Sequence, residues 1–301
     1  MQDREENTNE NRRTVFSIRF SIPGVIITFL ALVTFGIIFW MFLKNENRRD
    51  YREDQPEIIL SGDSIFAYYQ DERSVASRLS EISGKKVFDA SFGGTYLAYH
   101  DRDARLDDTS DAMSMVALTS AIINNDFRYQ KNAHISANGT EYFDERTEAL
   151  EKTDFGKAKI LIVEYMLNDY HSGITIESGS DIYDEYTYEG ALRSVVTQLK
   201  KAYPDLRIII AGAPVTWYEV THGIISSYER DFGGGNAEDY REVQKAVAEE
   251  LEVEYMDLSE AYDLSVADNI PVYTADGIHP NEAGAEALAR YIWEYICADA
   301  D

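Results

Sequence analysis

The amino-acid sequence predicts an α/β fold in which helices cover both faces of a five-stranded parallel sheet, with one membrane-spanning helix ahead of this domain. Three observations support the prediction. From residue 57 onward, short strand-like runs alternate with longer helix-like stretches, which is the order of elements that produces a parallel sheet. Residues 160–163 and 208–210 are apolar at every position, as expected of strands covered on both faces. Residues 20–43 contain 24 consecutive residues without a charge.

The elements of the α/β domain follow one another in a simple order. Strands are expected at residues 57–60, 87–90, 160–164, 207–212 and 253–256. Helices are expected at residues 72–82, 112–123, 190–202, 238–250 and 281–296. The polar segments 125–154 and 172–188 are expected to be loops, and either is a candidate to line a substrate cleft. Ligands of open α/β sheets bind beyond the carboxyl ends of the strands, so the residues that follow each strand are the first candidates for a functional site.

Residues 20–43 are expected to form a membrane-spanning helix. At about 1.5 Å per residue, this stretch crosses the roughly 30 Å hydrocarbon layer. It is longer than the apolar core of a signal peptide, and no small-residue cleavage site follows it. Trp40 near one edge suits the membrane interface. The prediction is therefore an uncleaved anchor, with a buried soluble helix as the alternative.

This anchor divides the chain into four predicted parts. Residues 1–19 are expected to form a short cytoplasmic tail, 20–43 the transmembrane helix, 44–56 a hydrophilic stalk, and 57–301 the α/β domain. Basic residues near the two ends of the apolar stretch are balanced, so they do not decide the orientation. Long domains cross membranes largely regardless of charge. The α/β domain is accordingly expected outside the cytoplasm, on a single-pass protein of the cell membrane.

Charge and composition narrow the partners. Residues 1–43 carry four basic and four acidic residues, so the net charge of −26 belongs to the rest of the chain. A negative field repels nucleic acid and polyanionic surfaces, which makes neutral substrates the expectation. The single cysteine, Cys297, allows no intrachain disulfide. No metal and no cofactor is expected, because spacing typical of metal ligands is missing around His100, His134, His171 and His222.

Two short motifs supply the parts of a nucleophilic site. Gly62-Asp63-Ser64 follows the first strand, and Asp276-Gly277-Ile278-His279-Pro280 precedes the last helix. A serine hydroxyl needs an imidazole to accept its proton, and the imidazole needs a carboxylate that fixes its tautomer. Asp276 and His279 are close enough in the chain to be paired within one loop. Each motif also has a simpler interpretation, as a helix start and as a turn.

With these motifs the chain resembles the SGNH (GDSL-type) hydrolases, a family of esterases, lipases, carbohydrate deacetylases and some acyltransferases. The resemblance covers about residues 57–296, and it implies a flavodoxin-like three-layer α/β/α sandwich. It also implies that Ser64 is the nucleophile, His279 the base and Asp276 the residue that orients the base.

Two middle blocks of the family build the oxyanion hole. Residues 89–95, Asp-Ala-Ser-Phe-Gly-Gly-Thr, resemble the second block, in which Gly94 best matches the glycine whose N–H faces the oxyanion and Gly93 is the alternative. Residues 164–169 resemble the third block, and Asn168 matches its amide donor. With the Ser64 N–H, these groups would give three donors. Met166 departs from the family, which usually has glycine there, and is expected to narrow the pocket or shift Asn168.

Together with the predicted anchor, the triad predicts a membrane-anchored serine esterase, and the family resemblance implies that it acts on small O-acyl groups, acetyl above all, on a polysaccharide. Contacts with the substrate are expected from Asp63, Gly93, Met166 and Trp217; for Trp217 the alternative is simple packing. Two other functions remain open. One is an acyltransferase that uses the same triad to move an acyl group onto a cell-surface polymer. The other is a non-catalytic binding module.

Overall fold

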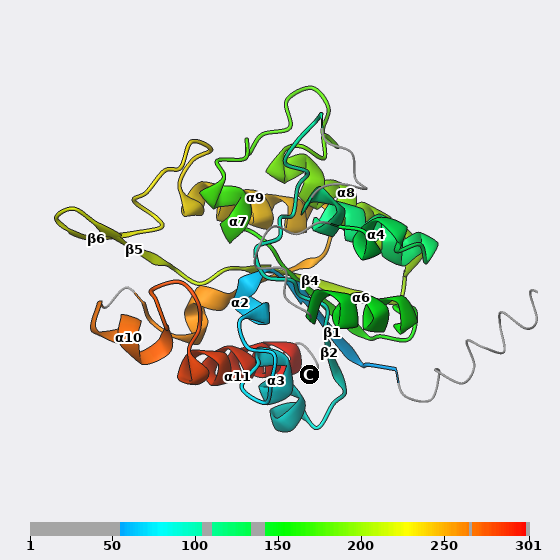
Figure 1. Cartoon of the computed structure of the whole chain (residues 1–301), viewed down its shortest axis with the longest axis horizontal. Helices are drawn as coiled ribbons and strands as arrows, with labels where there is room; N and C mark the ends of the chain where they lie inside the picture. The colour runs from blue at the N-terminus through cyan, green and yellow to red at the C-terminus, as the bar shows by residue number, and fades with distance from the viewer. Residues whose placement is uncertain (1–54, 104–109, 134–141, 265–266, 299–301) are drawn as a thin grey trace, which may run out of the picture. The chain divides into compact units, whose positions relative to one another are not determined.

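A computed structural model of the chain describes residues 55–103, 110–133, 142–264 and 267–298 (Figure 1). The predicted cytoplasmic tail, the transmembrane helix at 20–43 and nearly all of the stalk at 44–56 lie outside the described residues. Within the described residues, no helix has the length and apolar character needed to cross a membrane. The anchor therefore stays a prediction from sequence.

The described residues are built around a parallel sheet with the strand order β2-β1-β3-β4-β7. The strands are β1 (Ile58–Gly62), β2 (Val87–Asp89), β3 (Ile160–Glu164), β4 (Arg207–Gly212) and β7 (Glu254–Asp257). In register, Ile58 of β1 lies opposite Val87 of β2 and Ile160 of β3. Every pairing in this sheet is parallel. The predicted α/β class and the five-stranded parallel sheet are confirmed, with each predicted strand shifted by two residues or fewer.

Helices lie on both sides of the sheet, as Figure 1 shows. On one side are α3 (Val75–Ser83) and α11 (Glu282–Ala298), which contact each other extensively. On the other are α4 (Met115–Asn124), α8 (Tyr188–Ala202) and α9 (Ala237–Glu250). These five match the five predicted helices. Because both faces are covered, β1 is buried along its whole length and β3 and β4 are buried except at their first residues, which explains their unbroken apolar runs.

Several shorter elements complete the fold. They are α2 (Ser64–Ala67), η3 (Ser110–Met113), α5 (Arg128–Lys131), α6 (Tyr142–Lys152), α7 (Leu167–His171), η4 (Leu258–Ala261), η5 (Ala267–Asn269) and α10 (Ile270–Tyr273). Strands β5 (Trp217–Val220) and β6 (Gly223–Ser226) form an antiparallel hairpin that extends away from the main sheet (Figure 1).

The expectation of a loop at residues 125–154 is wrong for the short helix α5 and for most of its second half, where α6 forms. Only Phe143, Thr147 and Leu150 of this helix are buried. Such a narrow apolar stripe on an otherwise charged helix gives little periodicity in the sequence. Segment 172–187, in contrast, has no helix or strand, as expected.

Candidate active site

The nucleophile candidate lies in the turn that joins β1 to α2. Asp63 is the N-cap of α2, and its Oδ1 accepts a hydrogen bond of 2.9 Å from the Ile65 N–H. Ser64 is therefore the first residue of the helix, where backbone N–H groups have no partner within the helix. The Ser64 side chain remains partly exposed beyond the carboxyl end of β1.

The base candidate lies on a short closed loop between α10 and α11. Residues Thr274 and Pro280 form an isolated antiparallel bridge, and the Ala275 N–H donates to the His279 carbonyl at 2.9 Å. Asp276 organises the loop from inside. Its Oδ1 accepts hydrogen bonds from the backbone N–H groups of Ile278 (3.0 Å) and His279 (2.8 Å). Its Oδ2 lies 2.7 Å from His279 Nδ1.

The structure brings the three residues together. His279 Nε2 lies 3.0 Å from Ser64 Oγ, although the two residues are 215 positions apart in the chain. With Nδ1 held by Asp276, the tautomer with its proton on Nδ1 leaves Nε2 as the acceptor for the serine proton. This is the arrangement required for nucleophilic attack by a serine hydroxyl.

The electrostatics of Asp276 suit the role of orienting residue. Partial burial alone would raise its pKa, but the hydrogen bonds from the His279 ring and from the backbone N–H groups of His279 and Ile278 outweigh this and hold the pKa below its ordinary value. The carboxylate is thus ionised at neutral pH and stabilises positive charge on the imidazole.

The imidazole of His279 also has a support on its face. The ring of Tyr68 stacks on it, with 4.8 Å between the ring centroids and 12° between the planes. Tyr68 is the C-cap of α2, one helical turn after Ser64. The same short helix thus presents both the nucleophile and an aromatic ring to the base.

The loop after β2 distinguishes between the two glycine candidates for the oxyanion hole. The Gly93 N–H donates to the Tyr142 hydroxyl at 2.8 Å, so this donor is already engaged. Within the described residues, neither the Gly94 N–H nor the Ser64 N–H donates a hydrogen bond. Gly94 has φ +76, in the left-handed region that favours glycine. The geometry favours Gly94 over Gly93.

The third oxyanion candidate, Asn168, is less available. Its Nδ2 donates to the Thr95 carbonyl at 2.9 Å and makes a longer contact of 3.3 Å with Asp63 Oδ2. The longer bond is the one that can be exchanged for a substrate oxygen at lower cost. Asn168 nevertheless lies at the start of α7, beyond the carboxyl end of β3, where the sequence motif predicts it.

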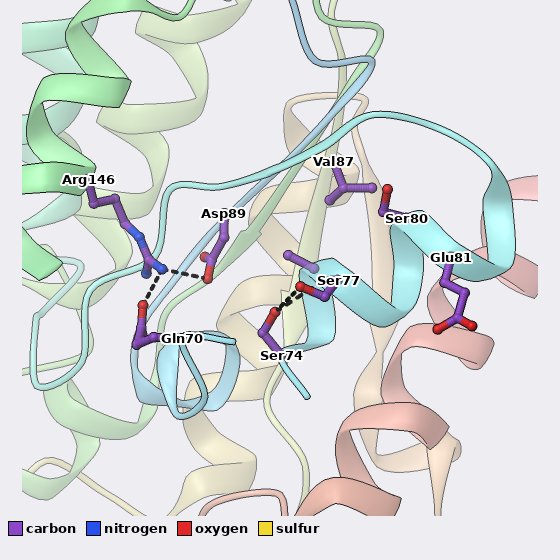
Figure 2. Close-up of a pocket in the computed structure, with 9 residues that line it drawn as sticks. Gln70, Ser74, Ser77, Ser80, Glu81, Val87, Asp89 and Arg146 are labelled. Carbon is purple, nitrogen blue, oxygen red and sulfur yellow. Dashed lines mark hydrogen bonds and ion pairs between the residues drawn. The ribbon is translucent and has the colours of Figure 1, made fainter. Parts of the chain in front are cut away.

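Helix α6 braces the loop that carries Gly94. Arg146 donates to the Ser91 carbonyl and to the side chain of Gln70, and forms an ion pair of 3.1 Å with Asp89. Arg146, Asp89 and Gln70 line a cavity of about 560 Å³, and Figure 2 shows the guanidinium of Arg146 pointing toward the other two side chains. This cavity contains none of the triad residues. The contribution of Arg146 to the site is structural, because its guanidinium links α6 to Gln70 and to residues 89–91.

Three fully buried carboxyl groups lie behind the nucleophile: Asp63, Glu164 and Asp169. Burial raises the pKa of Asp63 to about 6, against the opposing influence of the Ile65 N–H and of His279. Burial and the charge of Asp63 raise the pKa of Glu164 well above its ordinary value. Neither carboxyl oxygen of Glu164 has a hydrogen-bond partner among the described residues, so burial beside Asp63 favours its protonated, uncharged form.

Asp169 has a separate structural role. Its two oxygens accept the N–H groups of Leu97 (2.8 Å) and Ala98 (3.0 Å). Burial raises its pKa to about 7, although these two N–H groups lower it. Asp169 thereby holds the segment that follows Gly94 against α7.

Two of the predicted substrate contacts need correction. Asp63 and Met166 are 0% and 1% exposed, so neither side chain offers surface to a substrate. The hypothesis that Met166 narrows the pocket fails for the same reason, since its side chain lies in the hydrophobic core. Its φ of −162 lies outside the left-handed region that favours glycine, so the structure gives no sign that the position requires glycine.

The other two predicted contacts lie closer to accessible space. Gly93 lies beside the nucleophile, because a Cβ added to it would be 3.7 Å from Ser64 Cβ. Trp217 lines a cavity of about 360 Å³ that also includes Tyr218, Glu219, Asp276 and Gly277. The indole N–H of Trp217 donates to the Leu264 carbonyl at 2.9 Å, which fixes the ring at the cavity wall.

No group of three His, Cys, Asp or Glu side chains in the described part of the chain is arranged to hold a metal ion. The residues that sequence reasoning missed are Tyr68, Tyr142 and Arg146. Tyr142 and Arg146 contact residues that lie 49 and 55 positions away in the chain. A single sequence carries no signal for such distant contacts. A tyrosine one helical turn after Ser64 is the only one of the three with a local signal.

Comparison with known proteins identifies relatives of the chain. The model of the GDSL-like Lipase/Acylhydrolase family matches residues 60–287. No curated protein matches the chain by sequence.

Among solved structures, the chain is similar to a protein from Lactobacillus plantarum, with 18% identity and a TM-score of 0.56 over 81% of this chain and 98% of that one. A candidate lipase from Chitinophaga pinensis has 14% identity and a TM-score of 0.53 over 81% and 98%. A salicylyl-acyltransferase from a tetracycline biosynthetic pathway has 15% identity and a TM-score of 0.50 over 82% of this chain and 55% of that one. At these identities, the similarities show a shared fold.

Proposed function

We propose that this protein, which belongs to the GDSL-like lipase/acylhydrolase family, hydrolyses small O-acyl esters, acetyl esters above all, through an acyl-enzyme on Ser64. The observation that carries the proposal is the pair of contacts made by His279, at 3.0 Å to Ser64 Oγ and at 2.7 Å to Asp276. Family membership supports the class of reaction, and the geometry supports the role that we assign to each residue.

The first half of the reaction forms the acyl-enzyme. Ser64 Oγ attacks the ester carbonyl carbon while its proton passes to His279 Nε2. The carbonyl oxygen becomes an oxyanion that accepts hydrogen bonds from the Ser64 and Gly94 N–H groups and from Asn168; one such donor is commonly worth about 3 kcal/mol of barrier. His279 then gives the proton to the alcohol oxygen, and the bond between that oxygen and the carbonyl carbon breaks.

The second half releases the acid. Water attacks the acyl carbon and gives a proton to His279 Nε2. The new oxyanion collapses, the bond to Ser64 Oγ breaks, and the proton on His279 returns to the serine oxygen. Asp276 stays ionised throughout and stabilises the imidazolium that exists in each half.

Crowding around the nucleophile supports a small acyl group. A methyl group on Gly93 would meet the Tyr142 hydroxyl at 3.2 Å and lie near Ser64 Cβ. The backbone of the Gly93 loop and the Tyr142 ring therefore occupy space on this side of the serine. An acetyl group needs less room than a fatty acyl chain, which would need an apolar pocket of its own.

A carbohydrate is the alcohol part that we propose. The cavity beside Asp276 combines the ring of Trp217, held in place by its hydrogen bond to Leu264, with the carboxylate of Glu219. Aromatic faces stack on sugar rings, and carboxylates accept hydrogen bonds from sugar hydroxyl groups. The proposed substrate is an acetylated polysaccharide at the cell surface. We propose further that residues 20–43 anchor the protein in the membrane and that the catalytic domain lies outside the cytoplasm. The apolar composition of residues 20–43 supports this location, and separation of membrane and soluble fractions tests it.

Turnover of p-nitrophenyl esters by the full chain tests the chemistry. We expect acetate to exceed hexanoate in kcat/KM by about tenfold or more. Ser64→Ala should abolish both turnover and labelling by a fluorophosphonate probe, whereas Ser83→Ala, on α3, should change neither. Labelling of Ser64→Ala at the wild-type level would reject the assigned nucleophile, and an unlabelled wild type would favour a binding module.

Product analysis on acetylated polysaccharide separates hydrolysis from acyl transfer. Release of free acetate at a rate independent of added oligosaccharide supports the esterase. Slow release, with acetyl groups appearing on the added oligosaccharide, would instead support the acyltransferase.

A further inference from the structure

Arg230 differs from the other arginines of the described residues. Each of the others forms at least one ion pair with a carboxylate, and Arg230 forms none. Its guanidinium also donates no hydrogen bond to a described residue. It lies instead over two aromatic rings, with Cζ 4.4 Å from the centroid of Phe232 and 5.4 Å from that of Tyr218. A guanidinium stacked on rings keeps its N–H edge available for a planar anion.

The carboxylates closest to Arg230 in the chain are engaged elsewhere. Glu229 accepts hydrogen bonds from the backbone and side chain of Ser226, at 3.3 and 3.1 Å. Asp231 accepts the N–H groups of Gly233 and Gly235, at 2.6 and 3.0 Å. In a chain with a net charge of −26, an arginine between two acidic residues would ordinarily be neutralised. In this segment, both carboxylates accept hydrogen bonds from other donors and neither pairs with Arg230.

The segment that carries Arg230 is held firmly against the end of α7. The Tyr170 hydroxyl donates to the Arg230 carbonyl at 2.9 Å. Gly173 approaches Phe232 so closely that an added Cβ would lie 2.7 Å from the Phe232 carbonyl oxygen, which only glycine permits. The position of Arg230 is therefore fixed by packing, as a binding site that needs little rearrangement requires.

Arg230 is also connected to the catalytic centre. The hydroxyl of Tyr218, whose ring lies under Arg230, is 2.6 Å from His171 Nε2. His171 follows the oxyanion candidate Asn168 by three residues on α7, and Tyr218 shares a cavity with Asp276. Burial, together with His279 and Arg230, lowers the pKa of His171 to about 4, so this histidine is neutral and leaves Arg230 as the cation of the group.

We propose that Arg230, supported by the rings of Tyr218 and Phe232, forms an anion-recognition site beside the triad that binds a carboxylate or phosphate group on the alcohol part of the ester. This inference rests on the proposed esterase function, and it refines the substrate class that overall charge alone indicates. The acidic surface repels polyanions at a distance, whereas one fixed guanidinium selects a single anionic group at contact.

Three acetyl esters with related leaving groups test the site on the full chain. The anionic probes are 4-acetoxybenzoate and 4-acetoxyphenyl phosphate, and the neutral probe is 4-acetoxybenzamide. In Arg230→Gln, we expect kcat/KM to fall about 10- to 100-fold for the anionic probes, mainly through KM, and to change by less than about twofold for the amide. The anionic probe with the larger loss identifies the preferred group. Arg230→Lys should lose less, because it keeps the charge but not the planar fork.

Arg290→Gln is the matched control, since it removes the same charge from an exposed arginine of α11 that pairs with Glu286. It should leave all three probes unchanged. An equal loss for all three probes in Arg230→Gln would show a purely structural role and overturn the anion site. No loss for the anionic probes would overturn it as well.

Binding of 4-hydroxybenzoate, measured by calorimetry, tests the anion site apart from the chemistry. We expect the wild type to bind it and Arg230→Gln to bind it at least about tenfold more weakly. If the wild type cleaves no ester but binds 4-hydroxybenzoate through Arg230, the esterase proposal fails and the anion site stands. Equal affinities of the wild type and Arg230→Gln would overturn the site even in an active enzyme.

Discussion

Two aspartates flank the reacting pair of Ser64 and His279, and they lie in opposite environments. The Asp276 side chain is 47% exposed on a loop, and hydrogen bonds from His279 hold its pKa below the ordinary value. Asp63 is 0% exposed in the turn before α2, and burial raises its pKa to about 6. The comparison teaches that accessibility determines the role: the exposed carboxylate acts as a charge, whereas the buried one caps α2 and helps to raise the pKa of Glu164.

The largest expected effect concerns the exposed carboxylate, Asp276, and its partner His279. Substituting His279→Ala should lower kcat by about 10⁵-fold, and Asp276→Asn by about 10³-fold, because some rate survives when only the orienting charge is lost. Turnover of p-nitrophenyl acetate at neutral pH checks both. Equal losses would show that Asp276 does more than orient the base. An unchanged rate in Asp276→Asn would remove it from the triad.

The buried carboxyl groups around Asp63 lead us to predict an effect on the free energy of unfolding. The unfolded chain ionises Glu164 near its ordinary pKa, whereas the folded protein keeps it protonated to higher pH. The folded state therefore binds more protons above that ordinary value, and the free energy of unfolding falls as pH rises. Glu164→Gln mimics the protonated acid and lacks this dependence. The free energy of unfolding of Glu164→Gln, relative to that of the wild type, should rise by more than about 1.4 kcal/mol between pH 5 and pH 8. This amount corresponds to a tenfold change in proton affinity.

Urea unfolding at the two pH values measures this difference. Glu249→Gln, at an exposed position on α9, is the control and should show no comparable gain. A Glu164→Gln variant that loses stability relative to wild type as pH rises would contradict a protonated Glu164. Because Glu164 belongs to the buried surroundings of Asp63, that result would also mean that the environments of Asp63 and Asp276 are more similar than the structure indicates.

The smallest expected effect lies between the two aspartates, at the oxyanion loop. Tyr142→Phe removes the acceptor of the Gly93 N–H, so the loop can turn and Gly94 is less well aimed. We expect kcat to fall about 3- to 10-fold with KM nearly unchanged, since a misplaced donor affects the transition state more than the substrate. Tyr129→Phe, at an exposed tyrosine, should have no effect. A change in KM alone would mean that Tyr142 contacts the substrate and does not position Gly94.

The sequence predicted the sheet and the arrangement of the triad for local reasons. Buried strands have unbroken apolar runs, and Asp276 and His279 pair within one turn, so both signals lie in a few consecutive residues. The contacts of Tyr142 and Arg146 depend on segments far apart in the chain, which no local pattern encodes. The expectation that Met166 narrows the pocket failed because its side chain packs into the hydrophobic core, which the motif itself does not encode.

The bond between Ser64 and His279 has a consequence for biosynthesis. The hydroxyl leaves the ribosome 215 residues before the imidazole does, so a nascent chain carries its nucleophile without a base through most of translation. In the proposed mechanism, hydrolytic activity begins only once the final loop and α11 have emerged and docked. Premature termination between residues 64 and 279 yields a polypeptide that retains Ser64 and lacks the histidine proposed to activate it.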